Sequence, residues 1–138
     1  MMLKDRFAKA WAEDLTQRVG LPCFPSRHDG LTAPPFGVVL VKQMEQTVPG
    51  SDVWTAEVRV VLVSDTSETG VVQQSEWLEA ARAGIEATPR PAWDAQNRVR
   101  LYGFMIETVE QVTAQDDQGR RIYSDVLMIR AGVGGSAG

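Results

Sequence analysis

The sequence predicts an α+β domain with a mainly antiparallel sheet, built from two long β-hairpins that pack with two helices in the order α-β-β-α-β-β. Three observations support this prediction. Residues 36–64 contain two apolar runs separated by VPGS at 48–51, a sequence typical of a type II turn. Residues 99–131 repeat that design. Two segments, 3–19 and 71–88, carry apolar residues at helical spacing.

The first predicted helix covers residues 3–19, where apolar side chains recur at every fourth position and form one stripe. The stripe consists of Leu3, Phe7, Trp11, Leu15 and Val19. Gly20 fits the left-handed position that follows a helix, and Pro22 prevents the helix from continuing. We therefore expect the helix to end at residue 19 and to pack on the sheet.

Residues 20–35, GLPCFPSRHDGLTAPP, hold four prolines and two glycines and are predicted to be irregular. They include Cys23, His28 and Asp29. A metal site needs more ligands than this, and a Cys–His nucleophile pair needs a third, orienting group. Two interpretations stay open: a local hydrogen bond between the histidine and the aspartate, or contact of the whole segment with a partner.

The base of the first hairpin is apolar on both faces. Its predicted pairs are Val41 with Val60, Leu40 with Val61, Val39 with Leu62, and Val38 with Val63. A half-exposed sheet would instead alternate apolar and polar residues. We therefore expect this base to be covered on both sides.

The same hairpin becomes polar on both faces near its turn. The apolar exceptions are Met44, Trp54, Ala56 and Val58. An indole is costly to leave in water, so Trp54 indicates that something packs on it. The end is either an ordinary solvated hairpin tip or an arm that reaches a neighbouring subunit. In the second case, the candidate oligomer or partner contacts are Met44, Trp54, Glu57, Val58, Arg59 and Trp93.

The second predicted helix, residues 71–88, has one apolar face. This face consists of Trp77, Leu78, Ala81 and Ile85. Gly84 lies beside it and indicates a close approach of the helix backbone to the sheet. The sequence Thr88-Pro89 ends the helix.

The second hairpin is predicted from residues 99–112 and 121–131, joined through the turn sequence DDQG at 116–119. Its strands are apolar far from the turn and polar close to it, as in the first hairpin. The expected neighbours are Val112 with Tyr123 and Ile106 with Ile129.

The 138 residues are expected to form one domain over 1–131, followed by a flexible tail at 132–138. A net charge of −4 and a pI near 5.0 argue against binding to a nucleic-acid backbone. The single cysteine excludes an internal disulfide and suits a reducing compartment. The charged N-terminal residues match neither a signal peptide nor a membrane span, so we expect the protein in the cytoplasm or in a particle assembled there.

Motifs for catalysis are missing from the sequence. It contains no glycine-rich phosphate loop, metal-ligand cluster, nucleophile elbow or zinc-finger spacing. We therefore predict no catalytic residues, no cofactor, no metal and no enzymatic activity.

The order helix, long loop, hairpin, helix, hairpin resembles that of the tail terminator (tail completion) proteins of long-tailed bacteriophages and related prophage or gene-transfer particles. The resemblance includes a strand ending in VLVSD, followed by a polar loop and the helix SEWLEAARAGIEA. It covers most of residues 1–131 as an arrangement of elements and transfers no single residue. It implies a homohexameric ring that caps the finished tail tube, stops tube polymerisation and joins the tail to the head-side connector.

The resemblance also implies partners and a location. The ring would bind the tail tube protein and a head–tail connector or neck protein. DNA would pass through it without sequence-specific binding, an acidic lining would avoid trapping that DNA, and no membrane would be involved. The protein would belong to the tail or neck of a virion assembled in the host cytoplasm. A closed ring needs two different patches on each subunit, and the hairpins would supply one of them.

Two alternatives stay open. The first is a head–tail connector or neck adaptor of the same kind of particle, which would also form a ring. The second is a small cytosolic α/β ligand-binding domain or enzyme. This alternative predicts a monomer or dimer with a deep pocket, whereas the ring predicts a shallow surface.

Overall fold

The computed structural model of the chain describes residues 2–20, 22–25, 36–65, 68–88, 98–115 and 121–135. Their elements are α1 (Leu3–Val19), β1 (Cys23–Phe24), β2 (Phe36–Gln46), β3 (Trp54–Asp65), α2 (Glu68–Glu86), β4 (Val99–Gln115) and β5 (Arg121–Gly135). Two helices and a mostly antiparallel sheet confirm the predicted α+β class.

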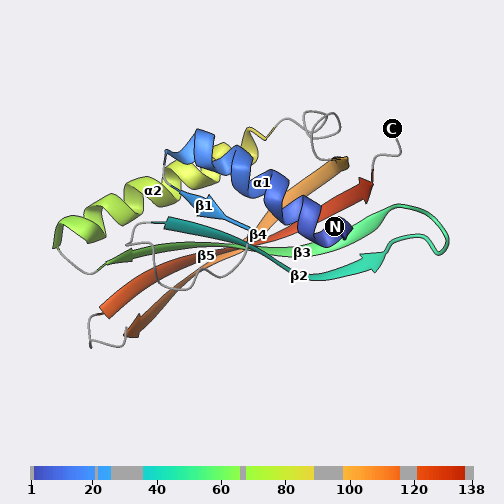
Figure 1. The fold of residues 1–138 in the computed structure, drawn as a ribbon. Helices are drawn as coiled ribbons and strands as arrows, with labels where there is room; N and C mark the ends of the chain where they lie inside the picture. Colours follow the sequence, from blue (N-terminus) through green and yellow to red (C-terminus); the bar gives the residue numbers. More distant parts are fainter. Residues whose placement is uncertain are drawn as a thin grey trace.

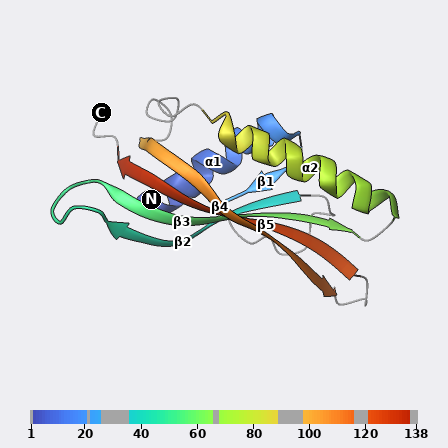
Figure 2. The same ribbon diagram turned by 180° about the vertical axis from the view of Figure 1, so that it is seen from behind.

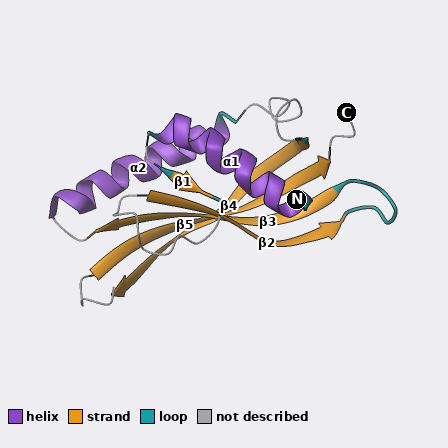
Figure 3. Ribbon diagram, in the orientation of Figure 1, coloured by secondary structure: helices purple, strands orange, loops and turns teal. Residues whose placement is uncertain are grey.

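The five strands form one sheet in the order β1-β2-β3-β5-β4. β1 runs parallel to β2, and every other neighbouring pair is antiparallel. The sheet is strongly twisted, and both helices lie on the same face of it (Figure 1). The view from behind and the colouring by secondary structure show this layering again (Figure 2, Figure 3). The described residues therefore form two layers with one face of the sheet free of helices.

The core lies between the helices and the sheet. Phe7, Trp11 and Leu15 of α1 and Ile85 of α2 are fully buried. The strand side chains that meet them are Val39, Val58, Val60, Leu127, Ile129 and Val133. The Trp11 ring lies 5.4 Å from that of Phe7 and 5.5 Å, edge-on, from that of Phe104 of β4. The apolar stripe predicted for residues 3–19 is therefore the face that α1 turns to the sheet.

The two helices approach each other closely at Gly84. A Cβ atom there would lie 3.2 Å from the Cβ of Arg18, so the missing side chain allows the contact. The predicted close approach is thus made to α1 and not to the sheet. Just beyond α2, the Thr88 hydroxyl donates to the Gly84 carbonyl at 3.1 Å and accepts from the Trp11 indole at 3.2 Å, which satisfies the buried indole N–H.

The segment 20–35, predicted to be irregular, begins with a short strand. Gly20 has φ of 81°, which confirms the predicted end of α1. β1 then pairs in parallel with the start of β2. Thr16 fixes this turn, because its hydroxyl accepts from the Cys23 N–H at 3.0 Å and donates to the Ala12 carbonyl at 2.8 Å. Two residues show no periodicity, so this strand leaves no signal in the sequence.

The predicted turn of the first hairpin is confirmed. Gly50 has φ of 81°, and the N–H of Ser51 donates to the carbonyl of Val48 at 3.1 Å. The N–H of Thr47 donates to the carbonyl of Val53 at 2.9 Å and closes the hairpin before the turn.

The predicted register of this hairpin is wrong by two residues. Val41 pairs with Val58 and not with Val60, and a bulge at Lys42 then reduces the difference to one residue nearer the turn, where Gln43 pairs with Glu57. The observed partners of Val38, Val39 and Leu40 are Val61, Val60 and Arg59. A shift of two residues keeps every side chain on its face of the sheet, so the predicted faces are unchanged at the base, whereas the bulge changes them nearer the turn.

The helices cover only one face at the base of this hairpin. On the other face, Val61 and Val63 are partly exposed, whereas Val38 is buried. The rings of Phe24 and Phe36, 6.2 Å apart, come from strand positions that share a face with Val38. The base of this hairpin was expected to be covered on both faces. This expectation is wrong in so far as both described helices lie on the same face.

The second hairpin follows the predicted register at its centre, where Ile106 pairs with Ile129. Nearer the turn, Tyr123 pairs with Thr113 instead of Val112, because a bulge after Ile106 adds one residue to β4. The predicted turn at 116–119 lies outside the described residues.

Two element boundaries differ from the prediction. α2 runs over Glu68–Glu86 and not over 71–88. β5 continues to Gly135, so the sheet includes four residues that were expected to begin a flexible tail at 132. The small residues of this segment pair with β3 and β4, and glycine gives no apolar pattern that would reveal a strand. Residues 136–138 lie outside the described part of the chain.

Gly37 offers a test of the β1–β2 contact. A Cβ atom on it would lie 2.9 Å from Sγ of Cys23 and 3.5 Å from Cδ2 of Leu62. We expect Gly37→Ala to lower the free energy of unfolding by about 1–3 kcal/mol, because β1 must move away from β2. Urea denaturation measures this loss. Gly103→Ala is the matched control, since a Cβ atom there would have no neighbour within 4 Å.

Repeating the Gly37→Ala substitution in a protein without the Cys23 sulfur tests whether the clash with that sulfur causes the loss of stability. Cys23→Ala removes the clashing sulfur, so Gly37→Ala should cost clearly less in that background than in the parent chain. An equal cost in both backgrounds would show that the sulfur contact is not the reason for the glycine.

Candidate functional site

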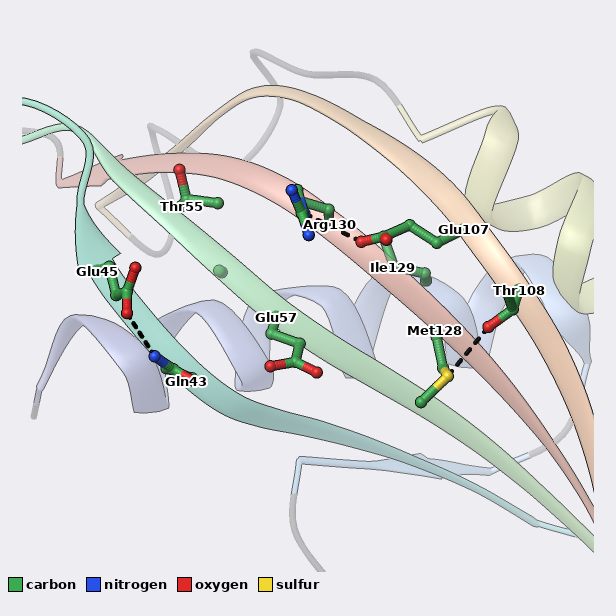
Figure 4. A pocket seen from close by; sticks show the side chains of 10 residues that line it. Gln43, Glu45, Thr55, Glu57, Glu107, Thr108, Met128, Ile129 and Arg130 are labelled. Atoms are coloured by element: carbon green, nitrogen blue, oxygen red, sulfur yellow. Dashed lines mark hydrogen bonds and ion pairs between the residues drawn. The ribbon is translucent and has the colours of Figure 1, made fainter.

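The face of the sheet that carries no described helix holds an open groove of about 400 Å³. Side chains from all four long strands line it, as Figure 4 shows: Gln43, Glu45, Thr55, Ala56, Glu57, Glu107, Thr108, Met128, Ile129 and Arg130. Thr55, Glu57, Met128 and Arg130 point into it, whereas the neighbouring Ala56 and Ile129 turn their side chains to the core and border the groove only through their backbone. The charged members are exposed, so the groove is mainly polar.

The polar groups of the groove are joined in pairs across and along the strands. Nε of Arg130 on β5 lies 3.0 Å from Oε1 of Glu107 on β4, and the Thr108 hydroxyl donates to Sδ of Met128 at 3.0 Å (Figure 4). On β2, the amide of Gln43 donates to Oε1 of Glu45 at 2.6 Å. These contacts hold the walls in place.

The charge of the groove is negative. It contains three glutamates and one arginine. The Glu107–Arg130 ion pair leaves 37% of the glutamate and 62% of the arginine side chain exposed, so it contributes about 0–1 kcal/mol to stability. Next to the groove, Nε of Arg59 is buried without a hydrogen-bond partner, which costs about 1–3 kcal/mol. This face thus carries both excess acid and one unsatisfied donor.

The structure places Trp54 in the sheet and not on a free arm. Trp54 is partly buried, begins β3 and pairs with Val133 of β5. Its indole N–H donates to Oδ1 of Asp52 at 3.2 Å. β5 supports β3 along its whole length, so the expectation of a separately projecting ribbon is wrong for this hairpin beyond its loop at 47–53.

The other predicted contact residues divide between the two faces. Val58 is fully buried and Met44 is packed against the core, so neither presents its side chain as an exposed patch. Glu57 and Arg59 face the opposite way; Glu57 lines the groove and Arg59 lies beside it, paired with Met128. The sequence placed polar residues on both faces here because the bulge in β2 was not foreseen. Trp93 lies outside the described residues.

Asp52 links the first hairpin loop to the end of β5, a contact that the sequence did not reveal. Its Oδ2 accepts from the N–H of Gly135 at 2.9 Å, while its Oδ1 accepts from Trp54. A Cβ atom on Gly134 would lie 2.7 Å from the Asp52 carbonyl oxygen and 2.9 Å from the ring of Tyr102. The glycines near the end of β5 therefore let the first hairpin loop contact the last strand directly.

Cys23 is the described member of the cysteine, histidine and aspartate group noted above; His28 and Asp29 lie outside the described residues. Burial raises the pKa of the Cys23 thiol to about 11, and a hydrogen bond with the Thr16 side chain opposes part of this rise. A neutral, buried thiol is a packing group and a weak nucleophile. No group of three His, Cys, Asp or Glu side chains suited to a metal ion occurs among the described residues.

Neither helix, within the described ranges, has the length and apolar character needed to cross a bilayer.

No protein-family model and no curated protein sequence matches the chain. Its fold is similar to that of a solved chain described as "Virion of native gene transfer agent (GTA) particle". The match has a TM-score of 0.57 and 16% sequence identity, and covers 97% of this chain and 95% of the other. At this identity the similarity shows a shared fold across nearly the whole of both chains.

The thiol gives a prediction with a defined pH window. Its pKa rises from 9.0 to about 11 on folding, so the thiolate at about pH 8 should be about 100-fold scarcer in the native than in the unfolded protein. We expect Ellman's reagent to label Cys23 correspondingly slowly without urea and rapidly in urea.

The same shift affects stability. The folded protein holds the proton more tightly, so the contribution is complete below pH 9.0 and is lost as the pH rises toward about 11. The urea midpoint of the parent chain should fall more than that of Cys23→Ala across this window. Parallel curves for the two proteins would refute the pKa shift.

Proposed function

We propose that this chain is a structural protein of a phage-like particle, a tail terminator that forms a ring, caps the tail tube, stops its polymerisation and joins it to the head-side connector. The observation that carries the proposal is the fold shared with a chain of the gene transfer agent virion, over 97% of one chain and 95% of the other. The order of elements in the sequence supports the same role.

The surface of the chain supports an assembly role. The groove is open and acidic, and the exposed large apolar side chains lie outside it. Those on β4 are Tyr102, Met105, Val109 and Val112. Val109 points to the helix face of the sheet, and Met105 and Val112 point to the other face, so this outer strand offers apolar side chains on both faces to a packing neighbour. An unsatisfied Arg59 donor beside the groove would also be satisfied by an acceptor from a partner.

A ring of six copies needs a heterologous contact between two different surfaces of the chain. The two faces of this sheet differ, one covered by helices and the other open and charged. In the proposed particle the ring lies in the tail or neck, assembles in the host cytoplasm and lets DNA pass through its lumen. The three groove glutamates would repel DNA if this face lines the lumen.

Native mass spectrometry tests the ring, with purified tail tubes as the second component. We expect a species of six copies, alone or at tube ends, and tubes that stop elongating when the protein is added. Binding to the portal-side connector without binding to tubes would instead assign the chain to the neck. A protein that remains monomeric under both conditions would refute both assignments.

Trp54 provides a variant for this assay. We expect Trp54→Ala to fold, since the side chain is only partly buried, and to weaken self-association at least about 10-fold if the indole contacts a neighbouring copy. Val48→Ala, an exposed apolar position in the adjoining loop, is the control and should leave association unchanged. Loss of the folded state in Trp54→Ala would assign the indole to the chain's own stability.

A further inference from the structure

The sheet has two open edges. β4 is its outermost strand on one side, with 17 residues and no strand beyond it among the described residues. On the other side, β1 pairs only with Gly37 and Val38, so β2 has no neighbouring strand beyond it from residue 39 to 46 among the described residues. An edge strand presents unpaired N–H and C=O groups, which makes it a template for pairing with another chain.

The distal part of β4 is the least protected edge. Bulges interrupt β4 near Tyr102 and Glu107, and bulges are a common way to discourage pairing. From Thr108 onward, however, β4 pairs with β5 residue by residue without interruption. Val109 and Val112 in this part are 37% and 46% exposed. A regular edge of this kind is a template on which a further strand can pair.

The strand directions determine how a second copy fits. The order β2, β3, β5, β4 alternates in direction at every step. If a second copy is placed beside the first in the same orientation, its β4 lies antiparallel to β2 of the first. The antiparallel ladder then continues from one chain into the next without a change in its geometry.

The charges favour this contact over a pairing of β4 with itself. Glu110 is an exposed acid on the distal part of β4, whereas Glu107 already pairs with Arg130. Lys42 is the exposed cation on the edge part of β2, which also carries Glu45. Two copies of β4 side by side would bring acid against acid alone, whereas β2 offers the Lys42 ammonium as a partner for Glu110.

We propose that the copies of the chain join through β4 of one copy and residues 39–46 of β2 in the next, so that one sheet runs around the ring. The contact uses two different surfaces and therefore propagates around a closed ring without a two-fold axis. This inference rests on the proposed ring and names the contact that builds it.

Two adjacent proline substitutions test the contact. Neighbouring residues of a strand direct their N–H groups to opposite sides, so of Glu110→Pro and Gln111→Pro one removes a bond to β5 and the other affects only the outer edge. We expect the variant that loses the bond to β5 to have a lower thermal midpoint. The variant changed only at the outer edge should keep the thermal midpoint within a few degrees and weaken self-association at least about 100-fold. Each variant is the control for the other.

Cross-linking identifies the partner strand. A chain carrying both Glu110→Cys and Gln43→Cys should give a ladder of covalent oligomers with a short bis-maleimide, while each single substitution and the parent, with its buried Cys23, should give monomers. A covalent dimer from Glu110→Cys alone would show that β4 pairs with β4 and overturn the proposal.

The outcomes separate this inference from the function. If each proline variant still forms six-fold assemblies and the double cysteine variant gives no covalent oligomers, the strand contact is refuted. The terminator role would then still stand. A chain that stays monomeric with and without tail tubes would refute the ring and the contact together.

Discussion

The pairing of β3 with β5 is the interaction on which the rest of the structure depends. The pairing runs without interruption from the pair Trp54–Val133 to the pair Asp65–Ile122. It joins two hairpins that are separated in sequence by α2. Without it, each hairpin would be a two-stranded ribbon, which is marginally stable in water. With it, β3 and β5 become the central strands, and their alternate side chains form the floor on which both helices pack.

The helices on one face leave the other face available for function. α1 and α2 bury aromatic and aliphatic side chains against the sheet, and the opposite face carries the acidic groove and the unsatisfied Arg59 donor. Because the described helices supply no cover there, that face and the two strand edges are the surfaces on which neighbours can pack.

Sequence patterns identified the elements with strong periodicity and missed those without it. The four-residue spacing of apolar residues such as Phe7, Trp11 and Leu15 predicted α1 to the residue, and Gly20 predicted its end. The register of the first hairpin was wrong by two residues at its base, and the bulge at Lys42, which has no signature in a polar run, changed it again nearer the turn. The end of β5 was missed because glycines pair by their backbone alone. β1 was too short to be recognised.

The candidate site was predicted only in part, for a physical reason. Glu57 and Arg59 were identified as surface residues near the turn; Glu57 lines the groove, and Arg59 lies beside it, paired with Met128. Val58 and Met44 were assigned to the same patch, although alternation along the strands turns them to the core. The groove also needs Glu107 and Arg130 from the second hairpin. Only the β3–β5 pairing brings those residues beside the first hairpin, and no local pattern encodes a pairing between distant segments.

The late position of β5 in the chain has a consequence during synthesis. β3 leaves the ribosome well before its central partner, so for the interval in which α2 and β4 are made it is bordered by β2 alone. A nascent chain in that interval presents a valine-rich border open to aggregation, and Asp52 has no Gly135 N–H to accept from until the last strand emerges. Slow closure of this long-range ladder is therefore the step at which chaperones would be most useful.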